Sequence, residues 1–372
     1  MSDRHLKRIL MTTDTVGGVW TFTLELARQF SKSGIQVVMA TLGGLPNPGQ
    51  TAEAESIPDL CLLSSDFKLE WMENPWDDVD ESGRWLLRLE QEYRPDLVHL
   101  NSFGHGNLNW SCPVMLTAHS CVLSWWAAVR NEPAPPTWNR YKATVARALQ
   151  AADVVTCPTT AMASELINYG DFAHSRAVVI PNGRDRTQFY RGPKEPFVIT
   201  AGRLWDEAKN TAAVAKVAGT LPWPVYAAGG NNSPRGESLH FPGVHLLGHL
   251  PTAELAHWLA RASIFALPAR YDPFGLGAVE AGLSGCALVL GDIPSQHEVW
   301  GDAALFVPPD DNVALQSSIR SLIDKPNLLA EMSERSCRRA LTFDPAQTAA
   351  LYLEAYRSAL SGSVSRALSC AS

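Results

Sequence analysis

Short apolar runs and amphipathic, helix-length stretches alternate along most of this chain. The first apolar run covers residues 8–13, and the helical pattern that follows it ends at Gly34. A second apolar run covers residues 35–42. A strand, a helix and a strand in this order form a βαβ unit, in which the two strands are parallel. The pattern therefore predicts a parallel β-sheet at the N-terminal end of the chain.

The same alternation continues in two halves of similar length. In the first half, further strands are predicted at residues 97–101, 113–119, 154–158 and 177–181. In the second half, strands are predicted at residues 197–202, 225–230, 244–249, 263–268, 286–292 and 304–308. Helices are predicted after Gly275 and at residues 141–151, 160–170, 211–219, 252–261, 312–324 and 345–360. Because these strands are apolar throughout, they are typical of a parallel sheet that is covered on both faces.

A polar stretch near the middle of the chain interrupts the alternation. It begins with the Pro-Asn-Gly turn at 181–183 and extends to Pro196. We place a domain boundary there, so that residues 1–182 form one α/β domain and residues 183–344 form another. Ligands of open parallel sheets bind beyond the C-terminal ends of the strands, so two such domains facing each other would form a ligand cleft. Residues 43–82 have the least regular pattern, and we expect long loops there.

The composition is that of an ordinary soluble protein. Of the 372 residues, 46% are apolar and 19% are charged, and a chain of this length favours two domains. The net charge of -7 argues against nucleic-acid binding, and no apolar run reaches the length of about 18 residues that spans a membrane. No apolar stretch of signal-peptide length precedes Asp14. The seven cysteines include no Cys-x-x-Cys pair, which indicates free thiols in a reducing cytoplasm.

Two cations follow the first strand of the second half. Arg203 and Lys209 lie between that strand and the next helix. Two fixed cations at a strand end could hold a diphosphate and neutralise its charge as it leaves. The alternative is a solvated loop, because surface Lys and Arg are common.

A second segment of this half, residues 269–285, enters a helix through a proline turn. The turn at 273–276 lies at a helix N-terminus, where free N–H groups favour an anion and Gly275 admits a phosphate close to the backbone. Glu280 could accept both hydroxyls of a ribose, and Asp272 could bind sugar hydroxyls. The alternative is a capped surface helix with two solvated acids.

In the first half, a glycine-rich turn follows the first strand. Gly17 and Gly18 come shortly after Asp14 and offer backbone N–H groups. The turn lacks the third glycine of a dinucleotide fingerprint, and no acid ends the next strand, so a nicotinamide site is disfavoured. His119 ends the strand at 113–119, and we expect it to face the cleft. The alternative is a buried structural imidazole.

Taken in order, these features are similar to those of a glycosyltransferase of the GT-B fold, in the large retaining group called family 4. The matching positions are Gly17, Gly18, His119, Pro181, Asn182, Gly183, Asp185, Arg203, Lys209, Asp272, Phe274, Gly275, Glu280 and the stretch 304–311. The resemblance covers nearly the whole chain and is densest at residues 177–310. Each match alone is weak, but the ordered set is specific.

The resemblance implies that the second domain binds a nucleotide-diphosphate sugar. Arg203 and Lys209 would bind the diphosphate, Glu280 would bind the ribose, and Asp272 would contact the donor sugar. The backbone groups that would assist with the diphosphate are those of Phe274, Gly275 and Leu276.

The resemblance also implies roles for the first domain. His119 would contact the donor sugar, and the turn at Gly17 and Gly18 would approach the phosphate and the acceptor. The candidate acceptor-binding residues are Asn101 and Trp125. Trp125 and Trp126 are adjacent and do not share a helix face, so at most one of them would line the acceptor pocket and the other would pack in the core. Such enzymes use no metal ion, and their final helix, at residues 345–372 here, packs back on the N-terminal domain.

Two positions depart from the family pattern. The first acid of the pair is usually Glu, and Asp272 is one methylene shorter, which would alter the choice of donor. The position after the Pro-Asn-Gly turn is usually aliphatic and is Arg184 here. The sequence suggests no role for this arginine.

Two other clusters carry weaker signals for a metal site. Asp78 and Asp80 could form the metal-binding Asp-x-Asp of another glycosyltransferase fold, but the acidic, loop-like stretch around them favours solvated acids. Three histidines lie close together in a stretch that is typical of a strand, which does not suit a metal site. They are His240, His245 and His249.

The sequence therefore predicts a retaining, metal-independent, cytoplasmic glycosyltransferase with a nucleotide-diphosphate sugar as donor and no cofactor. The acceptor would be a glycan, a lipid or a small molecule, and peripheral membrane contact is compatible with the sequence. Contacts to the base are expected from the backbone near Gly229, Gly230 and Gly248, so the base is not predicted. Two alternatives remain open: a non-catalytic relative that binds a nucleotide sugar, and a GT-B nucleotide-sugar epimerase.

Overall fold

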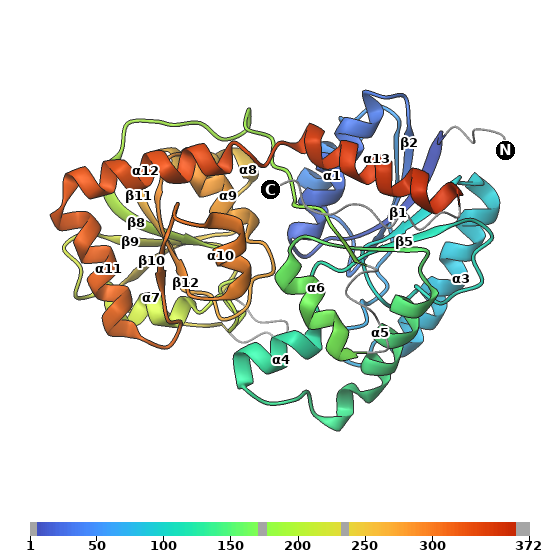
Figure 1. The fold of residues 1–372 in the computed structure, drawn as a ribbon, viewed down its shortest axis with the longest axis horizontal. Coiled ribbons are helices and arrows are strands. Elements are labelled where there is room, and N and C mark those ends of the chain that lie inside the picture. The colour runs from blue at the N-terminus through green and yellow to red at the C-terminus, as the bar shows by residue number, and fades with distance from the viewer. Residues whose placement is uncertain (1–5, 170–176, 232–237, 362–372) are drawn as a thin grey trace. The chain divides into compact units, whose positions relative to one another are not determined.

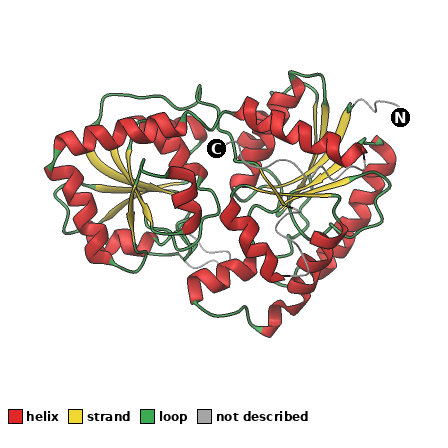
Figure 2. Cartoon of the chain, viewed as in Figure 1, coloured by secondary structure: helices red, strands yellow, loops and turns green. Residues whose placement is uncertain are grey.

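The chain divides into two compact α/β units, each with its own parallel sheet (Figures 1 and 2). The structure is a computed structural model that describes residues 6–169, 177–231 and 238–361. The first unit comprises Met1–Ser124, Pro133–Gly183 and Pro345–Ser372, and the second comprises Trp125–Glu132 and Arg184–Asp344. The division differs from the predicted domains in one main respect, because residues 125–132 group with the second unit.

The described residues of the first unit form a seven-stranded sheet in the order β3-β2-β1-β4-β5-β6-β7, and all its pairs are parallel. The strands are β1 (Arg8–Asp14), β2 (Gln36–Leu42), β3 (Leu60–Leu63), β4 (Leu97–Leu100), β5 (Val114–Thr117), β6 (Val154–Cys157) and β7 (Ala177–Val179). The order reverses between β1 and β4. In open α/β sheets such a switch point is where ligands bind, beyond the C-terminal ends of the strands.

Both faces of this sheet are buried, as continuous apolar strands require. Along β1, Ile9 and Met11 belong to one hydrophobic core, whereas Leu10 belongs to another on the opposite face. The helices of this unit are α1 (Gly18–Ser31), α2 (Pro48–Glu55), α3 (Trp76–Tyr93), α5 (Asn139–Ala151), α6 (Thr160–Leu166) and α13 (Pro345–Ser361). A further helix, α4 (Val122–Arg130), groups with the second unit from Trp125 onward.

The described residues of the second unit form a six-stranded parallel sheet in the order β10-β9-β8-β11-β12-β13. Its strands are β8 (Glu195–Ala201), β9 (Val225–Ala228), β10 (Val244–Gly248), β11 (Ala262–Leu267), β12 (Ala287–Gly291) and β13 (Leu305–Val307). Its helices are α7 (Thr211–Ala218), α8 (Thr252–Arg261), α9 (Leu276–Leu283), α10 (Pro294–Trp300), α11 (Asn312–Asp324) and α12 (Pro326–Ala340). The switch point of this sheet lies between β8 and β11.

The last helix, α13, completes the core of the first unit and lies beside α1 (Figure 1). Tyr352 and Tyr356 are fully buried. The hydroxyl of Tyr356 lies 2.7 Å from Nδ1 of His99, whose Nε2 lies 2.7 Å from the hydroxyl of Thr117. Hydrogen bonds and aromatic packing therefore hold this helix against β4 and β5. The predicted return of the final helix to the first domain is confirmed.

The prediction of long loops at residues 43–82 is confirmed only for residues 64–75, because α2, β3 and the start of α3 occupy much of the segment. Asn47 and Gln50 cap α2 through two reciprocal hydrogen bonds of 2.9 and 3.0 Å. The buried stripe of α3 includes Ser82 and Gly83, which weaken its hydrophobic periodicity. A Cβ on Gly83 would lie 3.4 Å from Leu108, so close packing favours the small residue that obscured the helix.

The other elements largely agree with the predicted ones, although α4, α10 and α12 were not predicted. Part of the predicted 160–170 helix and Cys370 lie outside the described residues. The six described cysteines are all free thiols. Within the described segments, no helix combines the length and the apolar character needed to cross a membrane.

Candidate functional site

Two loops of the second unit meet at its switch point. One, residues 202–210, follows β8, and the other, residues 268–275, follows β11. The amide of Arg270 donates to the carbonyl of Ala208 at 2.8 Å, and its guanidinium donates to the carbonyl of Glu207 at 3.1 Å. The backbone thus joins the loop that carries Arg203 and Lys209 to the loop that leads into α9.

Asn210 strengthens this connection. It precedes α7 in the left-handed region, with a φ of 56°, which Asn tolerates better than most residues. Its Nδ2 donates to the carbonyl of Pro268 at 2.9 Å and to that of Pro309 at 2.7 Å. Three strand-end segments are therefore fixed by one buried amide. This residue was not among the predicted site residues, although Asn directly before a helical pattern is a recognisable start signal.

The two predicted diphosphate-binding cations each pair with an acid. Nζ of Lys209 lies 2.8 Å from Oδ2 of Asp272, and their side chains are 18% and 9% exposed. This ion pair places Lys209 beside the turn that leads into α9. Nη2 of Arg203 lies 2.8 Å from Oδ2 of Asp206, while its buried Nε has no hydrogen-bond partner among the described residues. A buried donor without a partner is costly, so a ligand oxygen there would be stabilised.

Asp206 holds the loop after β8 in shape. Its Oδ1 accepts from the amide of Ala208 at 3.0 Å and from Nε1 of Trp125 at 3.1 Å. Burial acts to raise the pKa of Asp206, but the charges of Arg203 and Lys209 and these hydrogen bonds outweigh it and lower the pKa. Asp206 is therefore an ionised anchor for Arg203. Trp125, a predicted acceptor residue, contacts this loop through its indole N–H.

The start of α9 has the geometry of an anion site. Gly275 precedes the helix with a φ of +87°, and a Cβ there would lie 3.1 Å from Nε2 of Gln296. Nε2 of Gln296 donates to the carbonyls of Asp272 at 3.1 Å and Phe274 at 3.3 Å, which fixes the turn. The N-cap residue Gly275 has no side chain to cap α9. Its first-turn N–H groups, from Leu276 onward, are therefore suited to a phosphate.

Glu280 lies further along α9 and is buried. Its Oε1 accepts a hydrogen bond of 2.8 Å from Nε of Arg184, whose side chain is only 3% exposed. The predicted ribose-binding acid therefore pairs with the arginine for which the sequence suggested no role. The two residues lie 96 positions apart, so no local pattern could have revealed the contact.

The predicted base-binding glycines lie next to the loop after β8. The amide of Gly229 donates to the carbonyl of Gly248 at 2.7 Å, and Gly230 accepts from the amide of Leu204 at 3.1 Å. A Cβ on Gly229 would lie 1.8 Å from the carbonyl oxygen of Gly202, so only glycine fits. The strand-end segments of β8, β9 and β10 are thus closely packed.

In the first unit, the glycine turn after β1 is held by Asp14. Its Oδ1 accepts from the amides of Val16 at 2.9 Å and Gly17 at 3.0 Å. Gly17 is the N-cap residue of α1, which begins at Gly18, and it has no side chain to cap the helix. The turn therefore presents first-turn N–H groups at the switch point of the first sheet.

Asn101 and His119 lie together at the same switch point. Nδ2 of Asn101 donates to the carbonyl of Thr12 at 2.7 Å, which leaves its Oδ1 as an acceptor. Nε2 of His119 lies 2.7 Å from this Oδ1 and so carries the ring proton. Burial lowers the pKa of His119 to about 3, and the ring of Phe22 packs against it at 4.6 Å. His119 is therefore neutral near pH 7, with Nδ1 in the acceptor form.

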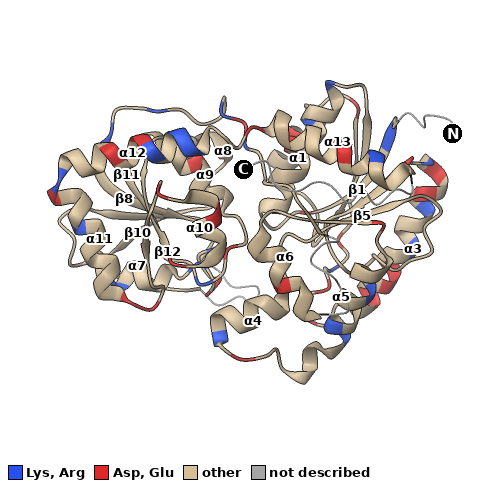
Figure 3. Ribbon diagram, in the orientation of Figure 1, with Lys and Arg blue, Asp and Glu red and all other residues tan. Residues whose placement is uncertain are grey.

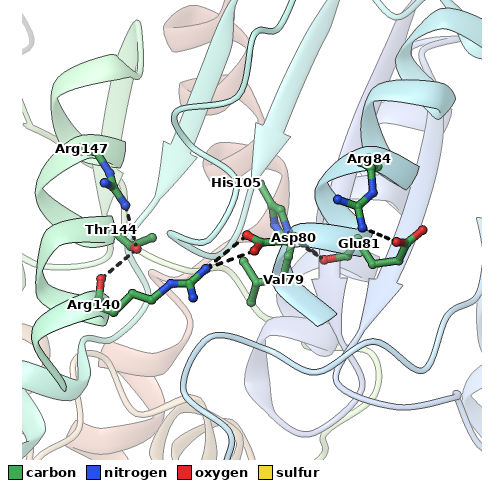
Figure 4. A network of polar contacts seen from close by, with 9 residues as sticks. Val79, Asp80, Glu81, Arg84, His105, Arg140, Thr144 and Arg147 are labelled. Carbon is green, nitrogen blue, oxygen red and sulfur yellow. Dashed lines mark hydrogen bonds and ion pairs between the residues drawn. The ribbon is translucent and has the colours of Figure 1, made fainter. Parts of the chain in front are cut away.

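The Asp78-Asp80 pair does not have the setting of a metal site. Both residues lie in the first turns of α3 rather than in the loop that we expected. Asp80 accepts from Arg140 of α5 at 3.1 Å (Figure 4). Asp78 accepts from the amide of Lys68 at 3.3 Å. Figure 4 also shows His105 beside the Val79 carbonyl, which it contacts at 3.3 Å. Both acids therefore already form hydrogen bonds with other residues of this chain.

The three neighbouring histidines do not form a metal site. His245 is exposed on β10 and packs against the ring of Tyr226 at 5.1 Å. Across the described ranges, no group of three or more His, Cys, Asp or Glu side chains is arranged to hold a metal ion.

Charged residues of both signs are interspersed on the helices of both units, as on α3 and α12 (Figure 3). The electrostatic character of the switch point therefore comes from individual loop residues such as Lys209, and not from a helix face of one sign.

Comparison with known proteins agrees with this architecture. Residues 16–188 match the family Glycosyltransferase Family 4, and residues 195–325 match Glycosyl transferases group 1. A glycogen synthase of Mycobacterium tuberculosis is 26% identical over 306 residues, which cover 73% of this chain and 72% of that protein. Sucrose-phosphate synthase from Thermosynechococcus elongatus superposes with a TM-score of 0.80 at 18% identity, covering 96% of this chain and 100% of that one. Anabaena Alr3699/HepE in complex with UDP-glucose superposes with a TM-score of 0.73 at 15% identity, covering 95% and 100%.

The chain belongs to the GT-B glycosyltransferases of family 4, the glycosyl transferases group 1. One family match falls on the first unit and the other on the second, and each unit is a Rossmann-like α/β domain. The fold and the family predicted from the sequence are confirmed.

Proposed function

We propose that this chain transfers a sugar from a nucleotide-diphosphate sugar to an acceptor hydroxyl, with retention of configuration at the anomeric carbon and without a metal ion. One observation carries the proposal: the Lys209–Asp272 ion pair holds a cation beside the uncapped N-terminus of α9. The complex of Alr3699/HepE with UDP-glucose supports a nucleotide-sugar donor, because that protein shares the fold.

The second unit supplies the groups that bind the donor. Lys209 and Arg203 neutralise the diphosphate, and the buried Nε of Arg203 gains an oxygen partner. The first-turn amides of α9 donate to the same group. Because these donors are fixed before the reaction, they stabilise the charge that develops on the departing diphosphate without reorganisation. Glu280 accepts from the ribose hydroxyls, and Asp272 contacts the donor sugar.

The first unit supplies neutral polar groups. Since Nε2 of His119 donates to Asn101, its Nδ1 accepts from a sugar hydroxyl. A neutral ring suits this task, because the sugar carries no charge. Asn101 is also a candidate for contact with the acceptor, although its side chain already bonds to Thr12 and His119.

In the transfer step, the bond between the anomeric carbon and the phosphate oxygen breaks, and a bond to the acceptor oxygen forms on the same face of the sugar. The acceptor proton passes to the leaving phosphate oxygen. No carboxylate nucleophile is invoked, because the acids of the second unit pair with cations: Asp272 with Lys209, Asp206 with Arg203, and Glu280 with Arg184.

The first experiment screens the purified protein against UDP-, GDP- and ADP-glucose and the corresponding galactose and mannose donors. A donor at 100 times its Kd should stabilise the fold by about 2.7 kcal/mol, which a thermal shift detects. Hydrolysis of the same donor, and product anomers resolved by NMR once an acceptor is found, test transfer and retention. No shift and no hydrolysis with any donor would contradict the proposal.

The second experiment tests the site with matched lysines. Lys209→Ala should weaken donor binding at least tenfold, because a charge-assisted contact to the diphosphate is lost. Lys216→Ala is the control, since Lys216 is exposed on the neighbouring helix α7. Equal affinities of the two variants by calorimetry would remove the proposed diphosphate site.

The same assays separate the two alternatives. A GT-B epimerase would interconvert the donor sugar slowly in the absence of any acceptor. A non-catalytic relative would show the thermal shift and the Lys209 effect without hydrolysis or transfer.

A further inference from the structure

Arg184 is a buried cation at the point where the chain enters the second unit. It is the first residue of the second unit after the Pro-Asn-Gly turn, and 3% of it is exposed. Its amide donates to the carbonyl of Phe343 at 3.0 Å, and its guanidinium lies 4.7 Å from the centre of the Phe189 ring. A buried guanidinium is stable only when it is paired and packed. The fold therefore holds this side chain in one position.

The partner of Arg184 is the acid that we place at the donor ribose. Nε of Arg184 donates to Oε1 of Glu280 at 2.8 Å, and the Glu280 side chain is 12% exposed. A carboxylate has about four acceptor sites on its two oxygens, so this bond still allows Glu280 to accept from a ligand. An aliphatic residue at position 184 could neither orient the carboxylate nor offset its charge.

Both effects matter at a ribose that carries a diphosphate. A carboxylate that binds two neighbouring hydroxyls must keep a fixed orientation, and a donor bond from a buried, immobile guanidinium supplies it. A lone carboxylate would also repel the nearby diphosphate, whereas the positive charge of Arg184 cancels this repulsion.

We infer that Arg184 is a positioning residue that orients Glu280 toward the ribose hydroxyls and thereby makes the site select ribonucleoside diphosphates over their 2′-deoxy counterparts. This inference rests on the proposed function of the second unit as the donor site. It assigns to Arg184 a role in specificity that acts through Glu280 and not through direct contact with the substrate.

The experiment compares the affinities of UDP, GDP and ADP with those of their 2′-deoxy analogues by calorimetry. The parent protein should prefer the ribonucleotide at least tenfold. Arg184→Leu and Arg184→Lys should each reduce this preference at least fivefold, because lysine keeps the charge but lacks the planar Nε donor. With a nucleotide sugar, KM should rise about tenfold while kcat changes less than threefold. The control Arg191→Leu, which removes an exposed Arg–Glu pair of the same unit, should change neither value.

A second set of variants distinguishes loss of the proposed role from loss of folding. Arg184→Leu leaves Glu280 buried without this cation, so the double variant Arg184→Leu/Glu280→Gln removes both charges. Glu280→Gln alone should abolish the ribose preference, and adding Arg184→Leu should change it no further. The inference is overturned if the folded Arg184→Lys protein keeps the parental preference, or if the double variant differs from Glu280→Gln. If the parent binds none of the three ribonucleotides, the proposed function fails and the inference falls with it.

Discussion

The two switch points of this protein share a topology and differ in chemistry. Beyond β1 and β4 of the first unit, one polar contact joins two neutral side chains, Asn101 and His119, and Asp14 bonds to backbone amides of the glycine turn. Beyond β8 and β11 of the second unit, the contacts are ion pairs, such as that of Lys209 with Asp272. Both sheets are parallel and reverse their strand order at one point, so the difference comes from the strand-end side chains. The fold supplies two topologically equivalent positions, and under the proposed function their residues have different roles.

This division matches the chemistry of a nucleotide-sugar donor. Its diphosphate is anionic and suits the cations of the second unit, whereas its sugar and an acceptor hydroxyl are neutral and suit the first. Variants that change one unit at a time test this difference between the two units.

The largest effect on turnover is expected from the cations of the second unit. Arg203→Ala should lower kcat about 10²- to 10³-fold, or about 2.7–4 kcal/mol, because a preorganised cation at the leaving group is lost. Steady-state assays with the donor identified in the screen measure this. The control is Arg320→Ala, since Arg320 is exposed on α11. A normal turnover number for Arg203→Ala would mean that the second unit does not use this charge.

The next effect concerns the stability of the first unit at acidic pH. Burial lowers the pKa of His99 to about 3. In the unfolded chain this imidazole binds a proton below about pH 6.5, whereas in the folded state it stays neutral until the pH approaches 3. Stability from this group is therefore present above pH 6.5 and is lost as the pH falls toward 3. The loss approaches about 1.4 kcal/mol per pH unit.

Urea unfolding at pH 7, 6 and 5 tests this prediction, with His99→Gln as the comparison. His105, whose pKa burial lowers to about 4, acts in the same direction, whereas Glu70, whose pKa burial raises, acts in the opposite one. The difference between parent and variant isolates His99. Equal pH slopes for the two proteins would contradict the assigned cause.

A smaller effect is expected at His119. His119→Ala removes one neutral hydrogen bond, which is worth about 0.5–1.5 kcal/mol, so kcat/KM should fall by about tenfold at most. Affinity for the free nucleoside diphosphate should stay within twofold, because the cations of the second unit bind it. With a pKa of about 3, His119 should cause no inflection in kcat/KM between pH 5.5 and 8.

His257→Ala is the matched control, because His257 is exposed on α8. A hundredfold loss of nucleotide affinity in His119→Ala would show that the first unit also binds the diphosphate.

No effect is expected from removing metal ions. Activity after treatment with EDTA and desalting should equal that of untreated protein, because in the proposed mechanism Lys209, Arg203 and the amides of α9 neutralise the diphosphate. A complete loss of activity that added Mn²⁺ reverses would support a metal site at Asp78 and Asp80.

Apart from β3, the strands and the strand-end positions of both sites could be predicted from the sequence, because buried parallel strands are continuous apolar runs. The helix α3 could not, since Ser82 and Gly83 lie in its buried stripe. The loop residues after β8 were also predictable, because short βα loops of a parallel sheet lie at its ligand-binding edge. The Arg184–Glu280 pair was not, because only folding brings its members together. Asn210 was overlooked because the carbonyls that it ties together belong to distant segments.

The position of α13 has a consequence for synthesis of the protein. Tyr352 and Tyr356 fill the interior of the first unit, yet they emerge from the ribosome only after the entire second unit has been made. The N-terminal portion, which is translated first, must therefore wait with part of its apolar interior uncovered. Chains that stop before Pro345 would leave that interior open to solvent, and they are natural substrates for chaperones and proteases.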